Sequence, residues 1–250
     1  MIYLKSEKEI EQIKKPCRIV AELLCDLKKI LKPGITTNYI NEQAESIAQK
    51  KKAKLAFKGY RGFPESICTS VNEEVVHGIP SSRILKEGDI VGIDVGIVVD
   101  GYYGDGAVTA AVGRISPDIQ MLMTATEKSL YLGIEQAKQG NRLSNISHAI
   151  QSHVELCGFS VVRDLVGHGI GKNLHEDPQI PNFGLPNQGP ILKEGMVLAI
   201  EPMVAKGSWE VEILRNGWTV VTKDKSFSAH FEHTVAITSK GVKILTVCED

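Results

Sequence analysis

Two acidic residues inside a strongly apolar segment are the first feature that could do chemistry. The segment IVGIDVGIVVDGYYGDGAVT runs from Ile90 to Thr109 and contains Asp94 and Asp105. Read with the two-residue period of a strand, its odd positions from 91 to 99 are all β-branched, which is typical of a buried strand. Asp94 falls on the opposite face of that strand, with a glycine two residues away on either side. Because burying an unpaired carboxylate costs several kcal/mol, we expect a positive partner close to Asp94.

The two aspartates alone leave two interpretations open. We expect a turn over residues 100–104, so that Asp105 stands at the start of a second apolar strand. Aspartate is common at strand ends, where it caps turns. Two acids at the ends of neighbouring strands can also bind a multivalent cation. The pair by itself favours neither a turn role nor a metal role.

An internal repeat adds two more acids to this pair. LKEGDIVGID at 85–94 aligns with LKEGMVLAIE at 192–201, with five identities in ten positions, and this alignment pairs Asp94 with Glu201. EHTVAIT, which begins at Glu232, likewise corresponds to DGAVTAA, which begins at Asp105. The sequence therefore predicts two αβ halves, at about 1–113 and 114–250, each supplying two acids from two strands. Since each half needs the other to bury its sheet, we expect residues 1–250 to form a single domain.

The same repeat predicts the elements that position these acids. Apolar residues at three- and four-residue steps indicate a helix that begins at Ser6, contains Pro16 and ends at the Lys-Pro-Gly sequence of 32–34. Thr37 is expected to cap a second helix. In the second half, the equivalent helices are expected to begin at Ser116 and near Ile146. Two short strands are expected at 66–71 and 75–77, before the long pair that carries Asp94 and Asp105.

Composition excludes several functional classes. A chain of 250 residues with a net charge of −1 has no general attraction for nucleic acids or membranes. No stretch approaches the ~20 apolar residues of a membrane span. Five scattered cysteines without a CxxC motif indicate a reducing cytoplasm. The only basic cluster is either a solvated helix end or a contact for ribosomal RNA, and consists of Lys50, Lys51, Lys52, Lys54 and Lys58.

Three histidines next to turn residues complete the candidate chemistry. His77 and His168 each precede a glycine, which lets backbone approach closely, and His175 lies in the sequence LHEDP. Four carboxylates with one imidazole are a ligand set for two divalent ions such as manganese, iron or cobalt. Two such ions balance four negative charges, and a pair of ions can activate a bridging water and polarise a carbonyl, so hydrolysis is implied. The remaining histidines are expected to be structural or exposed: His148, His153, His230 and His233.

These residues, within the motifs IDVG, HGIG, AIEP and FEHT, resemble those of the methionine aminopeptidases, in particular the short bacterial type I form. The resemblance covers nearly the whole chain. It implies an α+β fold, the pita-bread (creatinase/aminopeptidase) fold, in which two pseudo-symmetric αβ halves surround a curved antiparallel sheet. It also implies two divalent metal ions, of cobalt, manganese, iron or zinc.

The same resemblance implies a role for each candidate residue. Asp94 would chelate one metal, His168 and Glu201 would hold the other, and Asp105 and Glu232 would bridge both. A bridging hydroxide would attack the first peptide carbonyl, with Glu201 as proton acceptor. His77 and His175 would contact the substrate backbone, and His175 would help to stabilise the oxyanion.

By resemblance, an apolar pocket for a methionine side chain would be lined by Tyr60, Phe63, Cys68, Leu174 and Trp218. Each of them would be equally ordinary in a hydrophobic core. Phe63 and Leu174 depart from the family pattern, which has a hydroxylated aromatic residue and a phenylalanine at these positions. Asn72 and Ser228 match a monovalent cation site of the family, although an asparagine in a turn and a serine in a loop are also ordinary.

The function implied is removal of the initiator methionine from nascent proteins after deformylation, when the second residue is small and uncharged. A cytoplasmic monomer is expected, with contact to the ribosome surface left open and no membrane or sequence-specific nucleic-acid partner. A proline-specific peptidase of the same fold is the alternative, but such enzymes usually carry a preceding domain. Only 33 positions separate His168 from Glu201, which disfavours the type II enzyme with its inserted subdomain. A binding protein that kept the fold would tend to lose ligands, whereas all five are present.

Overall fold

The computed structural model describes residues 1–247. Four α-helices and one 3₁₀ helix occupy Glu7–Ile30 (α1), Thr37–Lys50 (α2), Pro117–Gln136 (α3), Ser144–Leu156 (α4) and Tyr60–Gly62 (η1). The strands are β1 (Lys54–Leu55), β2 (Cys68–Val71), β3 (Glu74–Val76), β4 (Ile90–Val99), β5 (Tyr102–Ala111), β6 (Ser160–Val161), β7 (Val166–Gly169), β8 (Glu176–Pro181), β9 (Val197–Ile200), β10 (Met203–Ala205), β11 (Val211–Ile213), β12 (Val220–Thr222), β13 (Ser228–His230), β14 (Glu232–Thr238) and β15 (Gly241–Ile244). None of the helices in this part of the chain has the length and apolarity needed to cross a membrane.

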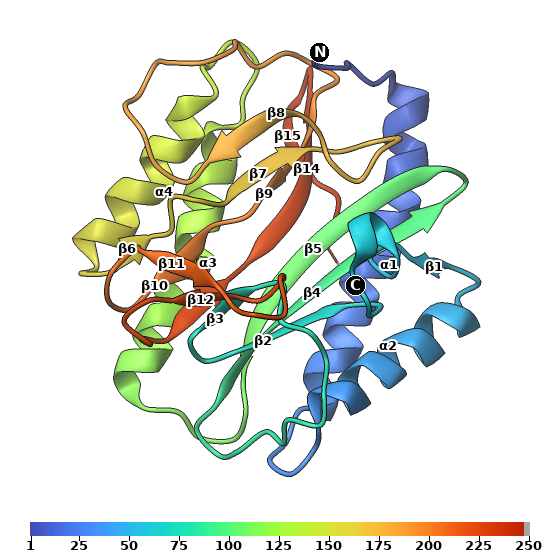
Figure 1. Cartoon of the computed structure of the whole chain (residues 1–250). Coiled ribbons are helices and arrows are strands. Elements are labelled where there is room, and N and C mark those ends of the chain that lie inside the picture. Colours follow the sequence, from blue (N-terminus) through green and yellow to red (C-terminus); the bar gives the residue numbers. More distant parts are fainter. Residues whose placement is uncertain (248–250) are drawn as a thin grey trace.

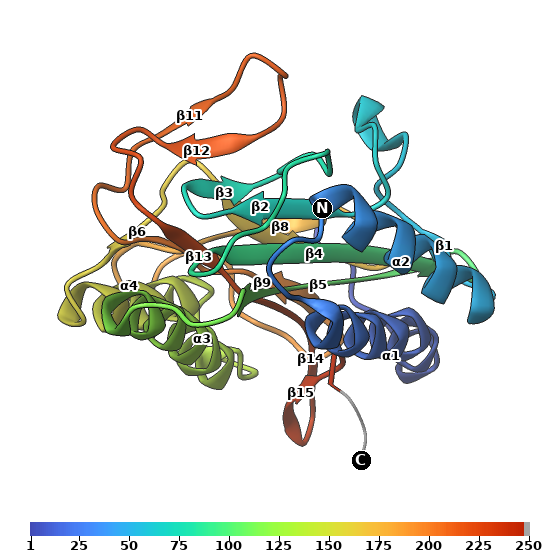
Figure 2. The same ribbon diagram turned by 90° about the horizontal axis from the view of Figure 1, so that it is seen from below.

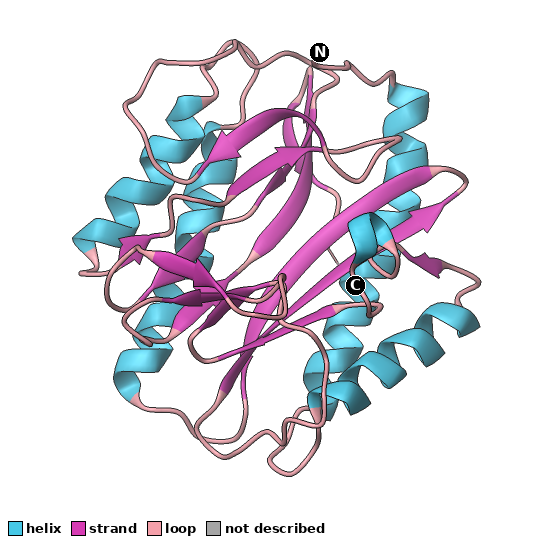
Figure 3. Cartoon of the chain, viewed as in Figure 1, coloured by secondary structure: helices cyan, strands magenta, loops and turns pink. Residues whose placement is uncertain are grey.

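A nine-stranded sheet runs through the middle of the molecule (Figure 1). Its main order is β1-β4-β5-β14-β9-β7-β8, with β2 also paired to β4 and β15 to β14. All the pairs are antiparallel. Helices flank the strands at both sides of the view in Figure 3. In Figure 2, α1 and α3 lie below the sheet, whereas β11 and β12 lie above it. One face of the sheet is therefore covered by helices, and the other is left for a site.

The two halves repeat one order of elements, as the sequence predicts. The first half supplies α1, α2, β4 and β5, and the second supplies α3, α4, β9 and β14. The halves join where β5 pairs with β14, with Ala107 opposite Glu232. Because this pairing is continuous, strands from both halves contribute to the same sheet face.

The starts of α1 and α2 are set by side-chain caps. Ser6 caps α1 through a capping box, in which its hydroxyl accepts from the Glu9 N–H and the Glu9 carboxylate accepts from the Ser6 N–H. The prediction that Thr37 caps α2 is wrong by one residue, because Thr36 accepts the Tyr39 N–H at 3.1 Å. The Thr37 hydroxyl instead exchanges two hydrogen bonds with the backbone of Ser81.

The hairpin of β4 and β5 has a shorter turn than the sequence suggests. Asp100 and Gly101 both have positive φ, 52° and 77°, as a two-residue type I′ turn requires. The strand β5 therefore begins at Tyr102, and Asp105 lies inside it rather than at its start. The predicted β-branched face of β4 is confirmed, because residues 91, 93, 95 and 97 are fully buried in a core that includes Val20 and Leu27 of α1.

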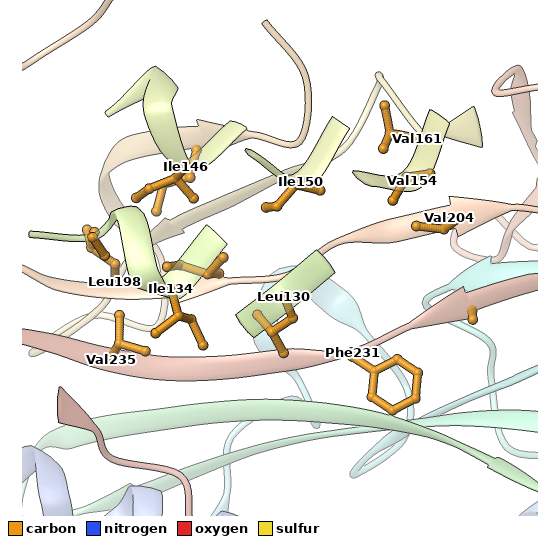
Figure 4. Close-up of a cluster of buried hydrophobic side chains, with 14 of the residues drawn as sticks. Leu130, Ile134, Ile146, Ile150, Val154, Val161, Leu198, Val204, Phe231 and Val235 are labelled. Atoms are coloured by element: carbon orange, nitrogen blue, oxygen red, sulfur yellow. The ribbon is translucent and has the colours of Figure 1, made fainter. Parts of the chain in front are cut away.

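A second core lies between the helices of the second half and the sheet (Figure 4). Leu130 and Ile134 of α3 and Ile150 of α4 pack with Leu198 and Val235 of β9 and β14. The two cores hold β4, β5, β9 and β14 from the helical side. They fix the strands that carry the candidate ligands.

Candidate metal centre

The register of the sheet places the acids on one face. Cys68 pairs with Asp94, Asp94 with Ala107, and Ala107 with Glu232, so these residues form one row across β2, β4, β5 and β14. Partners in an antiparallel pair point to the same side of a sheet. Asp94 and Glu232 therefore share a face, although 138 residues separate them in the sequence.

The other three ligand candidates follow from the same rule. Asp105 pairs with Gly96, two residues beyond Asp94 and so on the same face. His168 pairs with Ala199 of β9, and Glu201 comes two residues after Ala199. All five candidates thus project from one face of the sheet, opposite the helices.

Donor atoms of four of the five candidates converge, and Asp94 lines the same cavity. One ligand atom from each of Asp105, His168 and Glu232 lies within 4.8 Å of the other two. Nε2 of His168 lies 3.5 Å from Oε1 of Glu201 and 3.9 Å from Oδ2 of Asp105. The geometry is that of a site for a cation whose ligands come from both halves.

In the part of the chain that the structure describes, no lysine or arginine side chain neutralises the acids. Within residues 1–247 no lysine or arginine forms an ion pair with any of the four, and Oδ1 of Asp94 and Oε1 of Glu232 are buried without a hydrogen-bond partner. Orphaned carboxylate oxygens this close together are costly unless a cation binds them. The positive partner expected for Asp94 is therefore not a side chain, and the residues present fit divalent metal ions.

Burial has a large effect on the protonation of these acids. Desolvation, and then repulsion between neighbouring carboxylates, raises the pKa of Asp94, Glu201 and Glu232 well above the ordinary values. Burial also raises the pKa of Asp105, to about 7. A bound divalent cation has the opposite effect, since it favours the charged form of each ligand.

We expect the metal-free protein to lose stability as the pH rises from 6.5 to 8. An acid whose pKa is raised by folding holds its proton more tightly in the folded state, so deprotonation at higher pH favours unfolding. The free energy of unfolding falls by about 1.4 kcal/mol per pH unit for each proton that the folded state retains and the unfolded state has lost. Denaturant titration of the metal-free and manganese-loaded protein at both pH values measures it.

Histidines do not obscure this effect. Burial lowers the pKa of His168 and His233 to about 4 and that of His230 to about 3. A lowered histidine pKa makes stability rise with pH, but only up to the unfolded value near 6.5. Bound manganese should remove most of the decrease in stability between pH 6.5 and 8, because it favours the charged form of the acids. Stability that rises over this interval without metal would contradict the convergence of buried acids.

His168 is held in a neutral form that could bind a metal. Its Nδ1 lies 2.9 Å from the carbonyl oxygen of Gly169, and since a carbonyl only accepts, Nδ1 carries the proton. The lone pair of Nε2 then faces Asp105 and Glu201. A β-carbon on Gly169 would lie 2.1 Å from the Asp177 carbonyl oxygen, so the close approach expected after His168 requires glycine.

His77 and His175 stand at the edge of the same site. His77 has a positive φ of 58°, which is rare outside glycine and asparagine and is often found at functional sites. A β-carbon on the following Gly78 would lie 2.1 Å from the Thr69 carbonyl oxygen. The ring of His175 lies 4.3 Å from that of His168, between centroids. Partial desolvation in the cavity lowers the pKa of His175 to about 3, and the positive charge of Arg61 adds to this shift.

A cavity of about 140 Å³ joins these residues. It is comparable with cavities of ~150 Å³ that hold benzene, and so suits one side chain. All the residues proposed for the methionine pocket line it: Tyr60, Phe63, Cys68, Leu174 and Trp218. Phe57 and Arg61 line it as well, and sequence reasoning missed both. The sequence feature that could have pointed to Phe57 is the glycine at position 96, where a β-carbon would lie 2.5 Å from the Phe57 ring.

His230 is a further residue that the sequence did not assign to the site. It is buried, its Nε2 lies 3.7 Å from Oε2 of Glu201, and Nε2 has no hydrogen-bond partner. Its backbone is fixed by the Thr109 hydroxyl, which donates to its carbonyl and accepts from its N–H. The two-residue spacing from Glu232 was the available signal. His230 itself does not line the cavity, and neither do the other histidines expected to be structural or exposed.

The two residues proposed for a monovalent cation lie next to each other. The carbonyl oxygen of Asn72 accepts the N–H of Ser228 at 2.8 Å. The Asn72 side chain bonds Asp89 and the N–H of Ile90, and the Ser228 hydroxyl donates to the carbonyl of Val204. Both side chains therefore hold turns and strands together.

Comparison with known proteins agrees with this geometry. The family model for metallopeptidase family M24 matches residues 11–239. The chain is 57% identical over 246 residues to methionine aminopeptidase 1 of Bacillus subtilis, covering 98% of this chain and 99% of the relative. It superposes on the crystal structure of methionine aminopeptidase from Thermotoga maritima with a TM-score of 0.97, at 49% identity and with 99% and 100% coverage.

A more distant structure shares the fold alone. Prolidase from Pyrococcus furiosus matches with a TM-score of 0.80 at 23% identity, over 99% of this chain but 66% of the prolidase. Together these matches confirm the pita-bread fold that the resemblance implied.

Proposed function

The chain belongs to the methionine aminopeptidases of metallopeptidase family M24, and from this premise we propose that it releases methionine with two divalent ions rather than one. The observation that carries the proposal is the convergence of four carboxylates and one imidazole without a lysine or arginine partner in residues 1–247. One divalent ion would leave two of the four negative charges unbalanced in a buried site. Cobalt, manganese, iron and zinc all suit this donor set.

The proposal assigns the five ligands by the order of their strands. Asp105 on β5 and Glu232 on β14 lie between the strand of Asp94 and the strands next to Glu201 and His168, and would hold both ions. His168 and Glu201 would complete one site, since Nε2 of His168 lies 3.5 Å from Oε1 of Glu201. Asp94, with its orphaned Oδ1, would complete the other. When bound, the ions would lower the pKa of water and polarise the scissile carbonyl.

Three side chains of the protein would act on the substrate directly. Glu201 would accept the proton of the attacking water, because it is the one acid of the set held between two histidines, His168 and His230. His77 and His175, which both line the cavity, would bind the peptide backbone. His175 would also donate a hydrogen bond to the oxygen of the scissile carbonyl as negative charge develops there.

The aromatic end of the cavity would hold the methionine side chain. Phe63 and Trp218 meet edge to face with centroids 5.2 Å apart, and Leu174 is almost fully buried beside them. A thioether packs well against aromatic rings. Since Phe63 and Leu174 carry no polar atoms, this end of the pocket would select mainly by shape and apolarity.

Further properties are proposed from the family. The substrate would be a nascent protein with a deformylated N-terminus and a small, uncharged second residue. The protein would act as a cytoplasmic monomer whose residues 1–250 form a single catalytic domain. A monovalent cation would bind near Asn72 and Ser228, and the lysines of 50–58 would meet the ribosome surface.

Peptide assays test the proposed activity. With manganese or cobalt, the purified protein should release methionine from Met-Ala-Ser and should leave Met-Lys-Ser largely uncleaved. Equal release of alanine from an Ala-Pro peptide would favour the proline-specific alternative.

Replacing His77 should reduce turnover without removing metal. His77 lines the cavity and meets Trp218 with ring centroids 6.4 Å apart, but it is not one of the converging donors. We expect His77→Ala to lower kcat by about 10²-fold. His77→Asn is the matched variant, because asparagine tolerates the positive φ at this position. Loss of both metals in His77→Asn, measured by elemental analysis, would instead make His77 a ligand.

A further inference from the structure

Tyr60 contacts a proposed catalytic histidine from the other half of the molecule. Its hydroxyl oxygen lies 2.8 Å from Nδ1 of His175, although 115 residues separate the two in the sequence. The two rings are stacked, with centroids 5.3 Å apart and an interplanar angle of 22°. Both a hydrogen bond and a ring contact therefore fix the orientation of the imidazole.

The loop that carries Tyr60 is tightly bonded. The N–H of Tyr60 donates to the carbonyl of Phe57, and its own carbonyl accepts from Phe63. Gly59, Arg61 and Gly62 all have positive φ, a conformation that is strained for Arg61 and persists only where the surrounding contacts hold it. The loop thus holds the phenol in place before any substrate binds.

The hydrogen bond bears on which nitrogen of His175 carries a proton. A neutral imidazole has one N–H and one lone pair, and its tautomer is set by the partner of either nitrogen. A phenol is a stronger donor than acceptor, and an imidazole nitrogen is a stronger acceptor than a phenol oxygen. A hydroxyl that donates to Nδ1 leaves the proton on Nε2, which points away from Tyr60.

His168 provides the contrast within the same cavity. Its Nδ1 donates to a carbonyl, so its Nε2 carries a lone pair suited to a metal. The rings of His168 and His175 lie only 4.3 Å apart between centroids. Their hydrogen bonds nevertheless require opposite tautomers, with the proton on Nδ1 in His168 and on Nε2 in His175. One backbone carbonyl and one tyrosine hydroxyl are enough to give neighbouring histidines different chemistry.

We propose that Tyr60 is a positioning residue that holds His175 as the Nε2–H tautomer, ready to donate to the carbonyl oxygen of the substrate, an assignment that rests on the oxyanion role proposed above for His175. Lining the methionine pocket would then be only part of the contribution of Tyr60. In Tyr60→Phe the ring contact remains, but Nδ1 of His175 loses its donor.

The tautomer can be read directly. Long-range ¹⁵N–¹H spectra of the ¹⁵N-histidine-labelled, zinc-loaded protein distinguish the two forms. We expect an Nε2–H pattern for His175 in the wild type and a shift toward the Nδ1–H pattern in Tyr60→Phe. Tyr39→Phe, on exposed Tyr39, is the control and should leave the spectrum unchanged. An Nδ1–H pattern in the wild type would overturn the proposal.

A double-mutant cycle tests the catalytic consequence. With Met-Ala-Ser, Tyr60→Phe should lower kcat about tenfold and change KM less than about threefold, the effect of one lost hydrogen bond. Glutamine in place of His175 carries a donor that needs no tautomer, so Tyr60→Phe should cost less than about twofold in a His175→Gln background. Equal losses in both backgrounds would overturn the tautomer role. A wild-type kcat for His175→Gln together with His175→Ala would instead refute the oxyanion role itself.

Discussion

Asp105→Ala is expected to abolish methionine release and most metal uptake. Asp105 is almost fully buried in the middle of β5, and its carboxylate lies within 4.8 Å of donors from His168 and Glu232. Its removal takes one ligand from each proposed metal ion and leaves the remaining donors with excess space between them. We expect kcat/KM for Met-Ala-Ser to fall by about 10³-fold or more.

Metal content and activity should fall together in this variant. Asp118→Ala is the matched control, because Asp118 is exposed on α3, where it pairs with Lys206, far from the ligands in the fold. That control should keep both metal ions and full activity. Full activity in Asp105→Ala would remove Asp105 from the site.

Glu201→Gln is expected to separate catalysis from stability. Glutamine keeps the shape of the side chain but cannot accept a proton, so kcat should fall by about 10²–10⁴-fold. The same change removes a buried charge whose pKa is raised by desolvation and by Asp94 and Asp105. At pH 8 the metal-free variant should therefore unfold at a higher temperature than the metal-free wild type.

A lower kcat together with a higher unfolding temperature of the metal-free variant would identify Glu201 as a buried acid that acts in catalysis. Glu210→Gln is the matched control, since Glu210 is exposed and pairs with Lys223, and it should change neither quantity. A Glu201→Gln protein that is less stable than wild type without metal would show that Glu201 is already neutralised by a protein group.

The sequence was sufficient for features that depend on local pattern and on the internal repeat. The β-branched face of β4, the helix start at Ser6 and the equivalence of Asp94 with Glu201 follow from periodicity and alignment within the chain. Once these residues are assigned to strands, the register of the sheet places them on one face. For this reason the structure brings together all four acids that the two repeats supply.

Features that depend on tertiary contacts between segments distant in the sequence were beyond the sequence. The Tyr60–His175 hydrogen bond joins loops 115 residues apart, and no periodicity encodes it. His230 reaches Glu201 because β13 pairs with β10, a short sheet that the sequence did not reveal. The one-residue error at Thr37 has a similar cause, since a tertiary contact with Ser81 engages its hydroxyl.

Anomalous diffraction from a manganese-loaded crystal, recorded at the manganese absorption edge, tests the central claim most directly. We predict two manganese peaks in the cavity, both in contact with Asp105 and Glu232, with Asp94 on one ion and His168 and Glu201 on the other. A single peak, or carboxylates that remain protonated and bonded to one another at full manganese occupancy, would contradict a centre in which two cations balance the acids of both halves.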